Sequence, residues 1–300
     1  MRQKQSAADR TFTVFAYTFI LLFTLFCLFP FLLMIIGSFT DEGELIAHGY
    51  TLFPQKLSLD AYKAVLQSDV LFNGYAVTIF ITAAGALSAL CISAMLGYSL
   101  ANKRNVLRTP FLIFCYLPML FSGGIIPFYI VVSQWLHLQN TVWVLILTLL
   151  CQPFLVFLLV SFFRTIPEEL EEAARIDGAN EMRVFFQIMI PISKPILASV
   201  GLFYALNYWN DWFMGLMFVD NEKLFPLQLI LRRMVSNMEA AKNLIPAAAA
   251  IAVTPPTYGV RMATTVLTIG PIVLLYPMLQ KYFVKGLTVG AVKGNREFRH

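Results

Sequence analysis

The chain has 300 residues, of which 58% are hydrophobic and 13% are charged. Soluble domains average about 45 to 50% apolar and 25% charged residues, so this composition excludes an ordinary soluble protein and indicates an integral membrane protein. The formal net charge of +5 fits the basic residues that orient membrane helices better than it fits a nucleic-acid partner, so we expect no nucleic-acid binding.

Six apolar stretches are long enough to cross a bilayer as helices, which takes roughly 20 residues each. They cover residues 12–36, 74–96, 110–132, 142–163, 196–219 and 263–283. The sequence therefore predicts an all-α integral membrane protein, with residues 1–300 forming a single domain built as a six-helix bundle. In the second stretch Gly85, Ala89, Ser93 and Gly97 recur every four residues, which predicts close packing against neighbouring helices.

Basic residues gather at the N-terminus, in the loop after the second stretch and in the C-terminal tail. Because short cytoplasmic loops collect Lys and Arg, we expect both termini and this second loop to face the cytoplasm. The long loop of about 220–261 is then external. Its apolar runs, 224–234 and 245–259, predict either a surface that receives an extracellular solute-binding protein or a lid over the bundle's own outer face.

The third stretch contains Gly123, Gly124 and Pro127, which add backbone freedom and remove a helical hydrogen bond. We expect the helix to break or kink there. Broken membrane helices often border transport pathways, although a bend that only improves packing has the same sequence signature.

The segment of about 164–195, between the fourth and fifth stretches, is the most polar part of the middle of the chain. Thr165 and Glu168 have the spacing of a capping box, which predicts a helix that begins here with Pro167 in its first turn. Gly178 predicts the end of that helix, and a second short helix follows. Two helices joined at a glycine form a cytoplasmic knob that could dock on another protein. The alternative, an amphipathic helix lying on the bilayer, is disfavoured by four glutamates within five positions.

This segment resembles the signature of the membrane permeases of bacterial ATP-binding-cassette importers. The pattern E-A-A-x3-G-x9-I-x-L-P is matched by Glu172, Ala173, Ala174, Gly178, Ile188 and Pro191, with Ile190 in place of the usual leucine. The resemblance implies a type I importer fold in which the segment is a coupling helix held in a cleft of a cytoplasmic ATPase subunit. In that reading Glu172 is a polar anchor, Ala173 and Ala174 allow close approach, and Gly178 supplies the turn.

Three further stretches, FSGGIIPFY, YWNDWF and YPMLQKYFVKGLTVGAVKG, are similar to carbohydrate importers of the maltose type, in particular a subgroup for complex oligosaccharides. The resemblance implies import of a sugar, with an oligosaccharide or uronide fragments as the expected class. It also implies a location in the bacterial cytoplasmic membrane. The implied partners are a second permease subunit in a heterodimer, cytoplasmic ATP-binding subunits and an extracellular solute-binding protein.

The fifth stretch supplies the candidates for the substrate pathway: Asn207, Tyr208, Trp209, Asn210, Asp211 and Trp212. Asn207, Asn210 and Asp211 fall on one helical face, and an ionisable side chain inside a membrane helix is costly and typically functional. The aromatic side chains could stack on sugar rings. An aromatic belt at the outer membrane surface, or a role in helix packing or an outer gate, would use the same residues.

Two other functions compete with this one: a secondary transporter driven by an ion gradient, and an importer of the same family for a solute other than a sugar. Ion-coupled transporters usually carry paired ionisable residues near the middle of the membrane, and here Asp211 stands alone. The three histidines and four cysteines are scattered, which predicts no metal site. The sequence contains no phosphate-binding loop, so we expect that this chain is not an enzyme and that ATP is bound by its partner.

Overall fold

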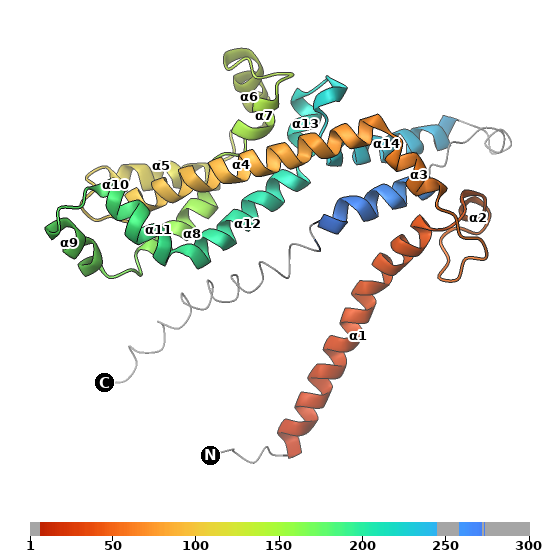
Figure 1. Cartoon of the computed structure of the whole chain (residues 1–300), viewed down its shortest axis with the longest axis horizontal. Helices are drawn as coiled ribbons and strands as arrows, with labels where there is room; N and C mark the ends of the chain where they lie inside the picture. The colour runs from red at the N-terminus through yellow and green to blue at the C-terminus, as the bar shows by residue number, and fades with distance from the viewer. Residues whose placement is uncertain (1–6, 245–257, 272, 274–300) are drawn as a thin grey trace. The chain divides into compact units, whose positions relative to one another are not determined.

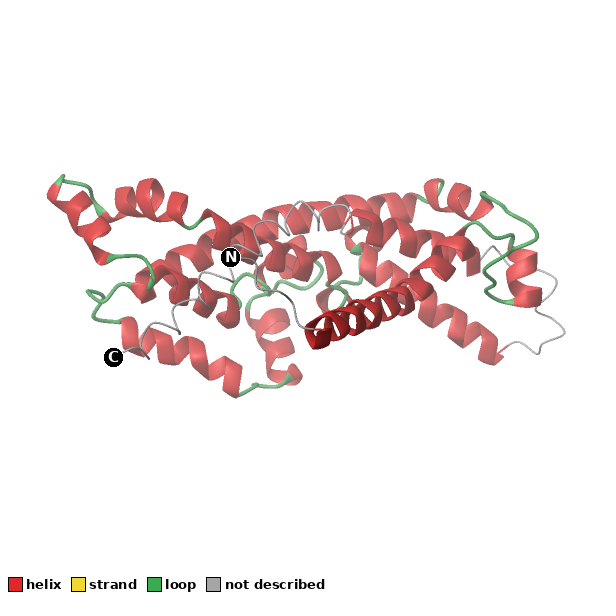
Figure 2. Cartoon of the chain, turned by 90° about the horizontal axis from the view of Figure 1, so that it is seen from below, coloured by secondary structure: helices red, strands yellow, loops and turns green. Residues whose placement is uncertain are grey.

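The computed structural model describes residues 7–244, 258–271 and 273, and every regular element in these residues is a helix (Figures 1 and 2). The predicted all-α fold is therefore confirmed. The chain divides into two compact units, Met1–Ser68 with Arg233–Ile269, and Asp69–Arg232 with Gly270–His300. We call them the first and second units and describe each by itself.

The first unit begins with the long helix α1 (Ala7–Ser38), which matches the first predicted stretch. Its apolar side chains are exposed along most of its length, as expected of a surface that lipid covers. Two short helices, α2 (Glu42–His48) and α3 (Asp60–Leu66), follow. The carboxylate of Glu42 accepts hydrogen bonds of 2.8 Å from the backbone N–H groups of Tyr258 and Gly259, at the start of the helix over 258–271.

The second unit is built around α4 (Asp69–Ala101), with α8 (Pro153–Phe163) and α12 (Lys194–Asn210) packed along it (Figure 1). All four small residues predicted to form a contact face on α4 are buried. A Cβ atom added at Gly85 would lie 2.6 Å from the ring of Tyr208, and one added at Gly97 would lie 2.9 Å from Leu159. The predicted close packing of this helix is confirmed, because nothing larger than hydrogen fits at these two positions.

The third predicted stretch is divided into α5 (Arg108–Leu120) and α6 (Ile125–Ile130), which continues into the π-helical turn η1 (Val131–Trp135). The helix axes before and after the break differ by 116°. Gly124 has a φ of +85°, a backbone conformation that glycine adopts without steric cost. The break lies at residues 121–124, where Gly123 and Gly124 stand, and Pro127 lies in the first turn of α6.

The fourth and fifth predicted stretches are also interrupted, which the sequence analysis did not expect. The fourth consists of α7 (Val142–Leu147) and α8, separated at residues 148–152. The fifth consists of α12 and α13 (Phe213–Phe218), separated at Asp211 and Trp212. Within the described residues, two continuous helices, Arg10–Ser38 and Asp69–Ala101, are long and apolar enough to cross a membrane, and two bent helix pairs also meet that test when each is taken as one span.

The segment after α13 contains the short 3-10 turn η3 (Glu222–Leu224) and α14 (Leu227–Leu244). Within the second unit the first turns of α14 pack inward: Leu227, Leu229 and Ile230 are buried, and the N–H of Leu227 donates to the Thr78 hydroxyl at 2.8 Å. Of the two apolar runs predicted for a binding-protein surface or a lid, the first therefore packs against α4. Most of the second, residues 245–257, lies outside the described residues.

Candidate functional site

The polar segment of 164–195 folds as two helices joined by a tight turn. The first is α9 (Glu168–Ile176) and the second is α10 (Glu181–Val184), which runs into the π-helical turn η2 (Phe185–Met189) and the single turn α11 (Ile190–Ile192). We call residues 164–192 the elbow. Its two helices and its turn agree with the arrangement that the sequence predicted.

The turn of the elbow is a Schellman motif centred on Gly178. The N–H of Gly178 donates to the carbonyl of Arg175 at 3.0 Å, and the N–H of Ala179 donates to that of Ala174 at 2.9 Å. Gly178 has a φ of +81°, and a Cβ atom there would meet nothing within 4 Å. Asn180 then begins α10, because its side chain accepts from the N–H of Arg183 at 2.9 Å. Glycine is required at 178 for its backbone conformation alone.

The start of the elbow differs from the prediction. Pro167 occupies the N-cap position of α9, without a side-chain cap, instead of lying in the first turn. The hydroxyl of Thr165 donates back to the carbonyl of Phe162 at 2.7 Å, so the predicted capping box with Glu168 does not form. That prediction was wrong because Thr165 completes the last turn of the preceding helix, and Glu168 is held by a distant lysine.

The signature residues of the elbow divide between its surface and its interior. Ala174 is buried in the core of the second unit, and Ile188 packs against that core. Glu172, Ala173, Gly178 and Pro191 are exposed. Ile176, at the tip of α9, is 87% exposed although its side chain is apolar. An exposed apolar tip on a polar helix is the surface that a protein partner would cover.

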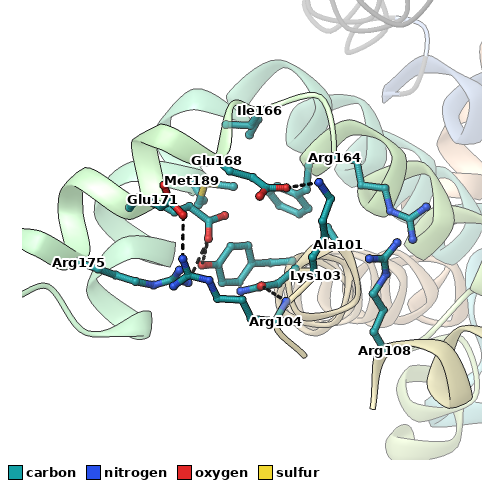
Figure 3. Close-up of a pocket in the computed structure, with 14 residues that line it drawn as sticks. Ala101, Lys103, Arg104, Arg108, Arg164, Ile166, Glu168, Glu171, Arg175 and Met189 are labelled. Carbon is teal, nitrogen blue, oxygen red and sulfur yellow. Dashed lines mark hydrogen bonds and ion pairs between the residues drawn. The ribbon is translucent and has the colours of Figure 1, made fainter. Parts of the chain in front are cut away.

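Two ion pairs tie α9 to the loop that follows α4 (Figure 3). The amine of Lys103 lies 2.6 Å from Glu168, and the guanidinium of Arg104 lies 2.9 Å from Glu172. Hydrogen bonding to Lys103 and its positive charge lower the pKa of Glu168. Exposed pairs of this kind add little stability, so their main effect is to fix the direction in which α9 points.

A third group of charges braces the inside of the elbow. Arg175 lies 3.2 Å from Glu171 on its own helix and 2.7 Å from Glu181 at the start of α10, so one guanidinium joins both helices across the turn. The hydroxyl of Tyr98, near the end of α4, donates to Glu181 at 3.1 Å and lies 3.4 Å from Glu171. Burial raises the pKa of Glu171, and the nearby Arg175 works in the opposite direction. The hydroxyl of Tyr98 therefore joins the elbow to α4. The ion pairs of Lys103 and Arg104 join the elbow to the loop that follows α4.

These side chains surround a cavity of 140 Å³ (Figure 3). The sequence analysis used Lys103, Arg104 and Arg108 only as orientation signals, and it did not connect them with the elbow. The glutamates that pair with Lys103 and Arg104 lie more than sixty positions further along the chain, so no local pattern revealed these pairs. In the residues that the structure describes, no group of three His, Cys, Asp or Glu side chains could hold a metal ion.

The substrate-pathway candidates also separate into two groups. Tyr208 is fully buried, with its ring against Gly85 and its hydroxyl donating to the carbonyl of Ile146 at 2.8 Å. Trp209 is buried as well. Asp211 caps the break after α12, since one of its carboxylate oxygens accepts from the N–H groups of Phe213 at 3.2 Å and Met214 at 3.3 Å. These three side chains shape the helix and its break.

The remaining candidates, Asn207, Asn210 and Trp212, each contact a polar side chain from another segment of the second unit. Asn207 donates to the side chain of Gln152 at 3.0 Å, and Asn210, one helical turn further along α12, accepts from Gln228 at 3.4 Å. Arg232 is four residues beyond Gln228 on α14, and its guanidinium carbon lies 3.8 Å from the ring centroid of Trp212. Gln152, Gln228 and Arg232 were missed by the sequence analysis because they belong to other segments. We call these six residues the polar column.

The sequence profile of the family described as "Binding-protein-dependent transport system inner membrane component" matches residues 89–289. The chain is 35% identical to the polygalacturonan/rhamnogalacturonan transport system permease protein YtcP of Bacillus subtilis (strain 168), over 95% of this chain and 99% of that protein. It is 39% identical to Protein LplC of the same organism, over 88% and 89%. Its fold is similar to a chain of a bacterial ABC transporter involved in the import of the acidic polysaccharide alginate, with a TM-score of 0.83, 28% identity, and coverage of 94% and 99%.

Proposed function

Because the chain belongs to the family of binding-protein-dependent transport system inner membrane components, we propose that it is the permease subunit of an ATP-binding-cassette importer for an acidic oligosaccharide. The family is a transport component and not an enzyme. The names of the relatives support the substrate class, because they include transport of polygalacturonan and rhamnogalacturonan and import of alginate. Family membership also disfavours a transporter driven by an ion gradient.

In this proposal six spans cross the cytoplasmic membrane of a bacterium, with both termini and the elbow in the cytoplasm. A second permease subunit completes the pathway, an extracellular solute-binding protein delivers the sugar, and separate subunits bind ATP. The elbow is the part that receives force from the ATPase. What supports this assignment most is the geometry of the elbow: a braced helical hairpin with Ile176 87% exposed at its tip.

The experiment that tests the elbow compares two glycines that both have positive φ and open surroundings. Gly178 has a φ of +81° in a Schellman turn, Gly49 has a φ of +72° with a ψ of −158°, and a Cβ atom at either would meet nothing within 4 Å. The backbone conformation of Gly49 is nearly restricted to glycine, so Gly49→Asp is the more strained variant and serves as a stringent control, and neither variant makes a clash within this chain. We expect Gly178→Asp to reduce ATP-dependent uptake at least tenfold in proteoliposomes, while Gly49→Asp stays near wild type. Equal activity of the two variants would remove the elbow from the coupling mechanism.

Glu172 allows a second arm of the same experiment. In the wild-type chain the guanidinium of Arg104 lies 2.9 Å from the carboxylate of Glu172. The charge reversal Glu172→Lys replaces this carboxylate with a cation and breaks the ion pair. If Glu172 acts only by orienting α9, the double reversal Glu172→Lys with Arg104→Glu restores uptake. If Glu172 is an anchor for the ATPase, as the family resemblance implies, the double variant stays uncoupled although the pair is re-formed. We expect the double variant to stay uncoupled. The measurement is the ratio of ATP hydrolysed to sugar taken up, which should be higher in the double variant than in the wild type.

For the substrate, we propose that the polar column faces the translocation pathway. Tyr208 packs against Gly85, which is the middle residue of α4, so the adjacent Asn207 lies near half the depth of that helix. Exposed carboxamides at that depth are costly against lipid and are tolerated where they face water, substrate or another subunit. Carboxamides both donate and accept hydrogen bonds, which suits sugar hydroxyl groups.

Uptake of a radiolabelled galacturonate trisaccharide, with the cognate binding protein present, tests this part of the proposal. Asn207→Leu keeps a similar volume and removes both the donor and the acceptor, so we expect KM to rise or uptake to fall about tenfold while basal ATPase activity is unchanged. Wild-type uptake of neutral galactotriose in preference to galacturonate would overturn the acidic substrate class. Unchanged uptake in Asn207→Leu would place the column away from the pathway.

A further inference from the structure

The cavity beside the elbow contains more basic than acidic side chains. Its basic residues are Lys103, Arg104, Arg108, Arg164 and Arg175, and its acidic residues are Glu168, Glu171 and Glu172. Each glutamate is paired with one of Lys103, Arg104 and Arg175. Arg175 also pairs with Glu181 beside the cavity, and in the part of the chain that the structure describes neither Arg108 nor Arg164 forms an ion pair.

These two guanidinium groups point toward each other (Figure 3). Burial and then repulsion from Arg108 lower the pKa of Arg164. Arg164 follows the C-terminus of α8, where the helix dipole favours a cation. Arg108 is the first residue of α5, where the dipole disfavours one. The positive charge of Arg108 is therefore repelled both by Arg164 and by the positive end of the α5 dipole. An anion between the two arginines would offset both repulsions.

We propose that Arg108 and Arg164 bind the phosphate of an anionic phospholipid headgroup. A guanidinium group binds phosphate oxygens through two parallel hydrogen bonds, and two facing guanidinium groups can hold one phosphate between them. Basic pockets between membrane helices on the cytoplasmic side are typical sites for anionic headgroups. Because neither arginine is paired with a carboxylate, the site favours a lipid with a net negative charge over a zwitterionic one.

The surroundings favour a lipid over a free phosphate ion. Phe111, Ile113 and Phe114 follow Arg108 on α5, and their side chains are 46%, 57% and 69% exposed. Arg164 likewise follows directly on the apolar helix α8. The two cations thus stand where polar chain ends and apolar helix surface begins, which is the arrangement of a lipid headgroup and its acyl chains. Free phosphate would make no use of the apolar side chains.

The test measures the unfolding temperature of the purified, delipidated permease–ATPase complex against increasing phosphatidylglycerol, phosphatidylcholine or inorganic phosphate. A ligand that binds only the folded state raises this temperature as its concentration exceeds Kd. We expect phosphatidylglycerol to stabilise the wild type most, and Arg108→Gln and Arg164→Gln each to weaken its apparent affinity about tenfold. Lys194→Gln is the control, because Lys194 is an exposed cation at the first position of α12, as the partly exposed Arg108 is at the first position of α5.

Three results would overturn the proposal. Equal stabilisation by inorganic phosphate would show a site for the free ion, and equal stabilisation of Arg108→Gln and Arg164→Gln would place lipid elsewhere. No response of the wild type to phosphatidylglycerol would show that a partner subunit supplies the anion. The inference rests on the membrane placement in the proposed function, but the assay measures no transport. A complex that transports nothing yet responds to phosphatidylglycerol through these arginines would separate the two conclusions.

Discussion

The elbow and the middle of α4 are held together by different interactions. At the elbow, Lys103, Arg104 and Arg175 each form ion pairs with glutamates of α9 and α10. Near the middle of α4, the contacts are neutral: the hydroxyl of Tyr204 bonds to Ser93 at 2.6 Å and accepts from the N–H of Gln152 at 3.1 Å. The difference reflects the surroundings of each region, because exposing a charged side chain costs little free energy in water and much more in lipid. Charges set the direction of the elbow, while close packing and neutral hydrogen bonds hold the helices.

The largest effect is expected from overpacking the neutral region. Gly85→Leu would force a side chain into the ring of Tyr208, which lies 2.6 Å from the position of an added Cβ. We expect a loss of about 1–3 kcal/mol in the free energy of unfolding. Gly123→Ala is the control, since nothing lies within 4 Å of its added Cβ. Equal unfolding temperatures for the two variants would show that packing at Gly85 does not hold the helices.

A smaller effect is expected from removing one buried hydroxyl. Tyr204→Phe leaves the hydroxyl of Ser93 and the N–H of Gln152 without this partner. The expected cost is about 1–2 kcal/mol, measured by denaturant unfolding of the purified complex. Tyr116→Phe serves as the control, because Tyr116 is 50% exposed and keeps its ring contact with Phe157 in either form. This loss should not depend on salt concentration, whereas effects at the elbow should.

The smallest effect is a change in how stability depends on pH. Lys103 lowers the folded-state pKa of Glu168, so Glu168 adds stability above its unfolded pKa and loses it as pH falls through the folded value. Burial raises the folded-state pKa of Glu171, so its contribution is present below the unfolded pKa and is lost as pH rises through the folded value. The ordinary pKa of both carboxyl groups is 4.5, so the two effects fall in the same pH range.

We therefore expect the two glutamine variants to change the pH profile in opposite directions. From about pH 3 to pH 6, the rise of unfolding temperature with pH should be shallower in Glu168→Gln than in the wild type and steeper in Glu171→Gln. Parallel profiles for all three proteins would contradict the assigned causes, and they would weaken the contrast between a charged elbow and a neutral helix core.

The sequence predicted features that depend on neighbouring residues. The range of α4, its small-residue face and the turn at Gly178 all have local causes, namely apolar length, four-residue spacing and a required positive φ. The break before α8 has a local signal too, because Pro153 stands at its first turn. What the sequence could not show is the partner that makes this break tolerable: the N–H of Gln152 is satisfied by Tyr204, 52 positions away.

The same limit applies to the candidate site. Glu172 was predicted as an anchor for another subunit, and its pairing with Arg104 within the chain, 68 positions away, had no local signature. Tyr208 and Trp209 have aromatic side chains of the kind that stack on sugar rings, but both side chains are buried in the structure. Periodicity places a residue on a helix face, whereas the direction of that face depends on neighbours from distant segments.

The hydroxyl of Tyr204 joins its own helix, α12, to two other segments. It bonds to Ser93 of α4 and accepts from the N–H of Gln152 at the start of α8. Gln152 in turn accepts from Asn207, one turn further along α12. A displacement of α12 relative to α4 would break a buried bond before the column could change shape. In the proposed importer the three helices would therefore move together, so that force applied at the elbow would reach Gln152 and Asn207 through all three helices at once.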